Sequence, residues 1–180
     1  PPPEVLVFTA AGLRESAPSV LDPEALAADL RIGVLGALIA ARAVLPAMRA
    51  AGQGSILFTG GGLAMEPVAA AASLSVQKAA LRNLVFSLHQ ELSPAGVHAA
   101  IVTIAGVLRE GSLLDSARVA DAFWTLVYPG ALLLSAILGI AMPMRAWLWG
   151  LIVGASTTLV GMFVVAAIRG TPIGGGWQLM

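Results

Sequence analysis

The sequence predicts an α/β fold with a parallel sheet, followed by two transmembrane helices. In the first two thirds of the chain, short apolar runs that end in small residues alternate with longer helical patterns, which is typical of parallel βαβ units. Charge then disappears. All ten acidic residues lie at or before Asp121, and beyond it only Arg145 and Arg169 are charged. We therefore predict an α/β domain over residues 1–121 and a membrane segment over residues 122–180.

The α/β region begins with the apolar run "VLVF" at residues 5–8, which the small residues "TAAG" follow. This pattern predicts a buried strand that leads into a turn. A long helical pattern covers residues 21–50, with Asp22 as a suitable N-cap and Pro23 at the first helical position. Its apolar positions are dense, so we expect the helix to be buried on more than one side.

The next part of the chain repeats the alternation. "GQGSILFTGGG" at residues 52–62 predicts a strand and a glycine-rich turn, residues 74–92 predict a helix, and "GVHAAIVTIAG" at 96–106 predicts a third strand. Ligands of such sheets bind at the carboxyl ends of the strands, so we expect the turns after the three strands to open on one crevice. The glycines of "TGGG" lack the Lys-Ser/Thr of a phosphate-binding loop and favour a tight turn.

The predicted membrane helices are the charge-free runs 122–144 and 146–168, each 23 residues long. As helices they would extend about 34 Å, enough to cross a hydrocarbon core of about 30 Å. Pro129 either kinks the first helix or delays its start, and a delayed start would leave a short, re-entrant span. The few charges favour both ends in the cytoplasm. We therefore expect a bacterial inner-membrane protein whose α/β part faces the cytoplasm.

The composition restricts the classes of partner. The chain is 58% hydrophobic and only 11% charged, against about 25% charged in ordinary soluble domains. The net charge is zero, which argues against a nucleic-acid partner. There is no cysteine, and His89 and His98 are too few for a metal site. We expect membrane lipid and protein partners, no metal and no nucleic acid.

Several stretches, in order along residues 4–127, carry a family resemblance: "FTAAG", "RIGVLGALIAARAVLPAM", "GSILFTGGGLAMEP", "LSVQKAALRNLVFSLHQEL", "HAAIVTIAG" and "ADAFWTLV". Together they resemble the short-chain dehydrogenase/reductase (SDR) family. The resemblance implies a partial Rossmann-like parallel sheet whose N-terminal strands would precede residue 1. It also implies NAD(P) as cofactor, held by loop and helix residues: Thr9, Ala10, Ala11, Gly12, Lys78 and Gly106.

The departures from the family concern catalysis. The family uses Asn, Ser, Tyr and Lys, and the register places Gly33, Gly61 and Leu74 at the first three positions, so that only Lys78 remains. Loss of a positioned acid removes about 10²–10⁴ of rate. Three hydroxyls lie near the missing one in sequence, but Ser73 and Ser75 should point elsewhere on the helix and Thr59 is poorly placed. We therefore assign no catalytic residue and lean against an enzyme.

Truncation and the tail are two further departures. The family's glycine-rich pyrophosphate loop would precede residue 1, so this chain alone should bind NAD(P) weakly, and the strand "VLVF" should have an exposed edge. The abrupt change after residue 127 is also what a composite reading frame would produce.

Three functions fit these observations. We favour a membrane-anchored, catalytically degenerate SDR-like protein that is an accessory or assembly subunit of a larger membrane complex, of respiratory or photosynthetic type. The first alternative is a membrane-associated NAD(P)-dependent oxidoreductase with atypical acid–base chemistry. The second is a purely structural membrane hairpin that carries a relic soluble domain.

Overall fold

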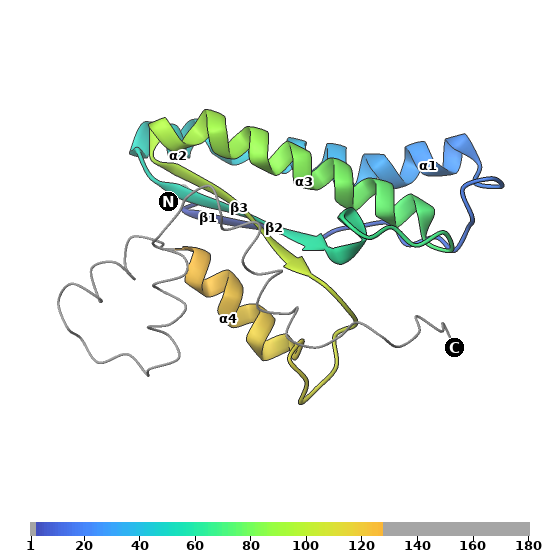
Figure 1. Cartoon of the computed structure of the whole chain (residues 1–180). Coiled ribbons are helices and arrows are strands. Elements are labelled where there is room, and N and C mark those ends of the chain that lie inside the picture. Colours follow the sequence, from blue (N-terminus) through green and yellow to red (C-terminus); the bar gives the residue numbers. More distant parts are fainter. Residues whose placement is uncertain (1–2, 128–180) are drawn as a thin grey trace. The chain divides into compact units, whose positions relative to one another are not determined.

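A computed structural model describes residues 3–127 of the chain (Figure 1). Two short 3₁₀ turns, Gly62–Ala64 and Ser93–Ala95, lie between its longer elements. In chain order the strands and longer helices are β1 (Val5–Phe8), α1 (Pro23–Leu30), a π-helix (Arg31–Leu35), α2 (Gly36–Ala51), β2 (Gly54–Gly61), α3 (Ala72–Leu92), β3 (Val97–Ile104) and α4 (Ser116–Val127).

The three strands form one parallel sheet in the order β1-β2-β3. The register pairs Val5 with Ser55 and Gly54 with Val97. Because the strands are parallel, their carboxyl ends lie at the same edge, and the loops after all three begin there. The predicted α/β fold with a Rossmann-like parallel sheet is therefore confirmed, and β1 has the predicted bounds.

Helices cover both faces of the sheet (Figure 1). The α1–α2 segment and α3 lie on one face, and α4 lies on the other. Alternate residues of β2 explain the two layers: Ile56 and Phe58 are fully buried in the core beneath α2 and α3, whereas the hydroxyl of Ser55 donates a hydrogen bond of 2.6 Å to the carbonyl of Val127 in α4. The core beneath α2 and α3 is completed by apolar side chains of those helices, including Ala37, Ala41, Leu45, Met48, Leu81, Val85, Leu88 and Leu92.

Local signals fix the helix ends as the sequence predicts. The Asp22 carboxylate accepts the backbone N–H of Glu24 at 3.3 Å, and Pro23 is the first residue of α1. The α2 helix ends at Gly52, which has a φ of +64°. Left-handed backbone of this kind is costly for residues with a Cβ atom, so glycine is the favoured residue there.

The predicted exposed strand edge is also present in the described part of the chain. There β1 pairs with β2 alone, and Val7 in the middle of β1 is 48% exposed. Such an edge offers unpaired backbone groups to another strand.

Residues 122–127, the beginning of the first predicted membrane span, belong to α4. This helix packs on the sheet, and Val127 is buried. The predicted boundary after Asp121 thus falls inside α4, and the described residues 3–127 belong to one compact unit. The remainder of the first span and the whole of the second, residues 146–168, lie outside the described residues, so both spans stay predictions.

Within residues 3–127, one helical stretch is long and apolar enough to cross a membrane by length and composition alone. It is Pro23–Ala51, with a mean hydropathy of 1.7. In the structure, Ala37 and Ala41 of this stretch lie in the core against the sheet.

Candidate functional site

Lys78 lies in α3, and its ammonium group reaches the carboxyl end of β2. The Nζ atom donates a hydrogen bond of 2.8 Å to the backbone carbonyl of Thr59. The stem of Lys78 passes over Gly61, where a Cβ atom would lie 3.4 Å from Lys78 Cγ. Lys78 as a residue is 8% exposed, and its burial lowers the pKa of the Lys78 ammonium below its ordinary value of 10.5. An ammonium has three N–H donors, so two remain for a ligand.

The residue one helical turn before Lys78 on the same face of α3 is Leu74, which has no proton to donate. The only tyrosine of the chain, Tyr128, lies outside the described residues. Both neighbouring serines are engaged elsewhere: Ser73 donates to Asp29 Oδ2 at 2.6 Å, and Ser75 donates to the carbonyl of Ala71 at 2.9 Å. The prediction that these two hydroxyls point elsewhere is confirmed.

Thr59 is the third hydroxyl near the missing phenol that the sequence offers as a substitute. Its carbonyl accepts the Lys78 ammonium, but its own Oγ1 atom is buried and has no hydrogen-bond partner among the described residues. An unpaired buried hydroxyl is costly, typically by about 1–3 kcal/mol.

Gln77, next to Lys78, fixes the loop that follows β1. Its Oε1 atom accepts the backbone N–H of Gly12 at 3.0 Å, and its Nε2 atom donates to the carbonyl of the same residue at 2.9 Å. Gln77 is 1% exposed. The side-chain amide thus satisfies both backbone polar groups of Gly12, and it ties the turn after β1 to α3.

A buried carboxylate extends this network. Asp29 of α1 accepts the hydroxyl of Ser73 and the guanidinium of Arg14, whose Nε lies 3.2 Å from Oδ2. The hydrogen bond from Ser73, and then the one from Arg14, hold the pKa of Asp29 below its ordinary value. The ionised Asp29 therefore joins α1, α3 and the loop after β1.

Two glycines make room for the network. A Cβ atom on Gly33, in the π-helix, would lie 2.5 Å from Gln77 Oε1, and one on Gly12 would lie 2.7 Å from Asp29 Oδ1. Both distances are too short for any side chain without a local shift. Gly33, Gly61 and Leu74, the three positions at which the resemblance places the family's Asn, Ser and Tyr, thus lie around Gln77 and Lys78.

The structure distributes the predicted cofactor residues over two neighbourhoods. Thr9, Ala10 and Ala11 are exposed in the loop after β1, and Gly12 joins that loop to the helix of Lys78 through Gln77. The remaining one, Gly106, follows β3. Its φ is +152°, and a Cβ atom there would lie 2.6 Å from Leu114 Cδ1.

Not all of these predicted cofactor residues are open to a ligand. The N–H and C=O of Gly12 are both bound to Gln77, which leaves the exposed residues 9–11 as the accessible part of that loop. The loops after β2 and β3 lie close together. A Cβ atom on Gly62, after β2, would be only 3.1 Å from the Cα atom of Ala105, after β3.

Sequence reasoning missed the network of Gln77, Asp29 and Arg14. A signal for it was present in α3. The buried positions in the C-terminal half of this helix are apolar, but several in its first two turns are polar, and of these Ser73 and Gln77 lie one turn apart. A polar pair at buried positions requires partners, and here the partners come from α1 and the loop after β1.

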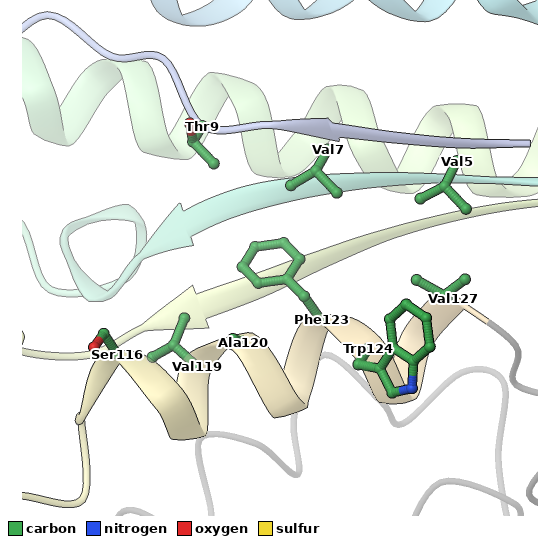
Figure 2. Close-up of a pocket in the computed structure, with 9 residues that line it drawn as sticks. All are labelled: Val5, Val7, Thr9, Ser116, Val119, Ala120, Phe123, Trp124 and Val127. Atoms are coloured by element: carbon green, nitrogen blue, oxygen red, sulfur yellow. The ribbon is translucent and has the colours of Figure 1, made fainter. Parts of the chain in front are cut away.

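A cleft of about 470 Å³ lies on the other face of the sheet, between β1 and α4 (Figure 2). Val7 of β1 and Phe123 of α4 face each other across it, and Val5 lies opposite Val127. The residues that line this cleft are almost all apolar, and Thr9 is the one predicted cofactor residue that contributes to the lining. The polar groups around Lys78 lie on the opposite face, so we place the candidate site there.

Comparison with known proteins agrees with this architecture. The short chain dehydrogenase family matches residues 4–112. A search among curated proteins finds no match. Among solved structures, an NADH-dependent reductase complexed with NAD is 19% identical, with a TM-score of 0.61, and the alignment covers 69% of this chain and 55% of that one.

Two more solved structures are somewhat closer in sequence. A metagenomic short-chain oxidoreductase in complex with NADP is 26% identical, with a TM-score of 0.58 and coverage of 68% of this chain and 54% of that one. An oxidoreductase of the short chain dehydrogenase/reductase family from Burkholderia thailandensis is 25% identical, with a TM-score of 0.55 and coverage of 66% and 45%. The present chain spans about half the length of these structures.

Proposed function

The chain belongs to the short chain dehydrogenase family, and from this premise we propose that it is a nucleotide-binding member without the usual acid–base catalysis of the family. We propose further that it is anchored in a membrane, where it acts as an accessory or assembly subunit of a larger complex. Binding and catalysis are separable in such a fold, because the sheet edge and the helix that bear the site remain intact when the proton donor is replaced.

One observation carries the loss of catalysis: the residue one turn before Lys78 is Leu74, and both nearby serines are committed to other partners. A dehydrogenase that reduces a carbonyl must deliver a proton to the product oxygen as the hydride arrives. No hydroxyl of the described α3 segment is free to deliver it.

Several features support weak binding of NAD(P). Two of the similar structures contain NAD or NADP. In this chain the ammonium of Lys78 has N–H donors left, and the loop residues 9–11 are exposed at the same sheet edge. These groups can bind a ribose or amide. The phosphate-binding loop that would supply most of the affinity is not among residues 1–180.

The proposal of a membrane location is supported by the sequence of the last third of the chain. The uncharged residues 128–144 and 146–168, which lie beyond α4, are separated and followed by arginines, and small residues recur every four positions, as at Gly150 and Gly154. Such spacing allows close helix packing in lipid. Among residues 3–127, β1 pairs with β2 alone, and its other edge offers a second place for a protein partner.

The decisive experiment uses the full chain purified in detergent from its native membrane. We expect it to co-purify with other membrane subunits, to bind NADP⁺ or NAD⁺ weakly, and to show no turnover with carbonyl substrates. Lys78→Ala should lower the affinity about tenfold, whereas Arg82→Ala, which removes a cation one turn further along α3, should leave it unchanged. A monodisperse chain without partners or nucleotide affinity would overturn the proposal.

A second candidate is an active oxidoreductase, and one observation favours it. Burial lowers the pKa of Lys78, so the ammonium is a stronger acid than an exposed lysine. It is then able to act as the proton donor in place of tyrosine. Turnover of NADPH with a lipid-like carbonyl compound, abolished by Lys78→Ala and retained in Arg82→Ala, would select this candidate.

A further inference from the structure

The amide of Gln77 makes an unusual contact, because a side chain of one element binds both backbone polar groups of a single residue in another. Gly12, its partner, is 65 residues away in sequence, and the two hydrogen bonds measure 3.0 and 2.9 Å. Two hydrogen bonds to the two peptide groups that flank the Gly12 Cα atom fix both the position and the orientation of that residue. The exposed residues 9–11 are thus held at their C-terminal end by Gln77 and at their N-terminal end by β1.

The orientation of the amide is itself fixed by neighbouring groups. The Ser73 hydroxyl donates to Asp29 at 2.6 Å. The Ser73 oxygen can therefore only accept a hydrogen bond from Gln77, and it does so from Nε2 at 3.4 Å. This arrangement directs Nε2 to Ser73 and the carbonyl of Gly12, and Oε1 to the N–H of Gly12. The negative charge of Asp29, which Arg14 balances, holds Ser73 in place.

The space for the amide exists because residue 33 is glycine. A Cβ atom on Gly33 would lie 2.5 Å from Gln77 Oε1, and the amide atoms of an asparagine lie about 2.4 Å from its Cβ, given bonds of about 1.5 and 1.2 Å. A side-chain amide carried by residue 33 would therefore reach the region that the Gln77 amide occupies. Gly33 also lies in the π-helix Arg31–Leu35, a local irregularity of the kind often found at functional sites.

We propose that Gln77 is the positioning residue of the candidate site. Its amide, which arrives from α3 over Gly33, holds the loop after β1 in the conformation that presents residues 9–11 to a ligand. That the ligand is a nucleotide rests on the proposed function, whereas the hold on Gly12 does not. We call Gln77 and Gly33 a matched pair, because the lack of a side chain at Gly33 leaves the space that the Gln77 amide fills.

The experiment measures backbone hydrogen exchange at Gly12 and NADP⁺ affinity in the full chain in detergent. In Gln77→Met, which keeps the length but not the hydrogen bonds, we expect the Gly12 amide to exchange at least tenfold faster and the affinity for NADP⁺ to fall at least threefold. The amides of β2 should be unchanged. The matched control is Gln90→Met, an exposed position on the same helix, which should alter neither quantity.

Unchanged protection of Gly12 in Gln77→Met would overturn the inference. If Gln77→Met does not fold, Gln77→Glu tests the same point, because it keeps the acceptor for the Gly12 N–H and loses the donor to the Gly12 carbonyl. Absence of NADP⁺ binding by the unaltered chain would overturn the proposed function instead, and the exchange at Gly12 would still decide the role of Gln77.

A relocation experiment tests the matched pair. Gln77→Ala alone should expose Gly12 to fast exchange, and Gly33→Asn alone should crowd the Gln77 amide and lower the melting temperature. The double variant Gly33→Asn with Gln77→Ala supplies an amide from the other side, and it should restore Gly12 protection to within threefold of the original. A double variant that exchanges as fast as Gln77→Ala would show that the amide at this point is not what holds the loop.

Discussion

At the scale of single residues, the candidate site is distinguished by what its side chains are already bound to. Lys78 is bonded to the Thr59 carbonyl, and Ser73 is bonded to Asp29. A hydroxyl committed to a buried carboxylate is a poor substitute for a catalytic phenol, however close it lies in sequence. The structure therefore explains at the level of individual bonds why the neighbours of Leu74 do not replace a tyrosine.

The first prediction concerns the carboxylate of this network. Because hydrogen bonds from Ser73 and Arg14 lower the pKa of Asp29, its ionised form stabilises the fold above the ordinary carboxyl pKa of about 3.9, and that stabilisation is lost as the pH falls through this value to the folded-state pKa. Asp29→Asn should therefore flatten the decline of melting temperature below about pH 4 and lower the melting temperature at pH 7.

The control for this prediction is Asp115→Asn. Backbone N–H groups of Ala117 and then Gly111 lower the pKa of Asp115 in an exposed loop, so this variant should remove a different part of the acid-side decline and leave the part due to Asp29. Identical acid-side curves for Asp29→Asn and the unaltered protein would contradict the assignment.

At the scale of the elements, α3 organises the described fold. Its buried apolar positions complete the core against the sheet, and its buried polar positions bind α1 and the loop after β1. The opposite face is held differently. There α4 packs on the sheet next to a cleft, and Val127 in its last described turn is tied to β2 by the hydrogen bond from Ser55 to the Val127 carbonyl.

The second prediction tests that tie. Ser55→Ala removes the buried hydrogen bond of 2.6 Å to the Val127 carbonyl and should cost about 1 kcal/mol. We expect the backbone amides of α4 to exchange about fivefold faster, with α3 unaffected. Ser87→Ala removes an exposed hydroxyl bond to Asn83 within α3 and should change neither helix. Equal effects of the two variants would contradict the tie.

At the scale of the whole molecule, the described residues comprise one parallel sheet with a free edge at β1, and the chain spans about half the length of the similar solved structures. The apolar surface that such an edge exposes favours association with further protein. The proposed membrane anchor depends on the two uncharged runs of the C-terminal third.

The third prediction tests the anchor. The full chain should remain with membranes after an alkaline wash. An arginine near the centre of each run, Leu134→Arg with Leu159→Arg, should cost about 2.5–3.5 kcal/mol per site for insertion and shift the chain to the soluble fraction. Val20→Arg with Leu113→Arg adds the same charge at exposed sites and should leave it in the membrane fraction. Retention of the first double variant in membranes would count against the spans.

The local order of the elements could be determined from the sequence. The bounds of β1, the cap at Asp22, the helix that bears Lys78 and the parallel sheet all follow from hydrophobic period, capping residues and alternation. These signals depend only on residues close together in the sequence, so they can be read without knowing which elements pack against each other. The sequence also indicated the absent proton donor, because a leucine at position 74 has no proton to give.

Only the tertiary structure decided which groups meet. Gln77 and Gly12 are far apart in the chain, and nothing in either local pattern predicts that one amide satisfies both polar groups of the other residue. Likewise, the uncharged residues 122–127 look like the start of a membrane span, but they lie in α4 on the sheet. Apolar character is the same towards lipid and towards a protein core, so burial alone, which depends on the packing of the whole fold, distinguishes the two.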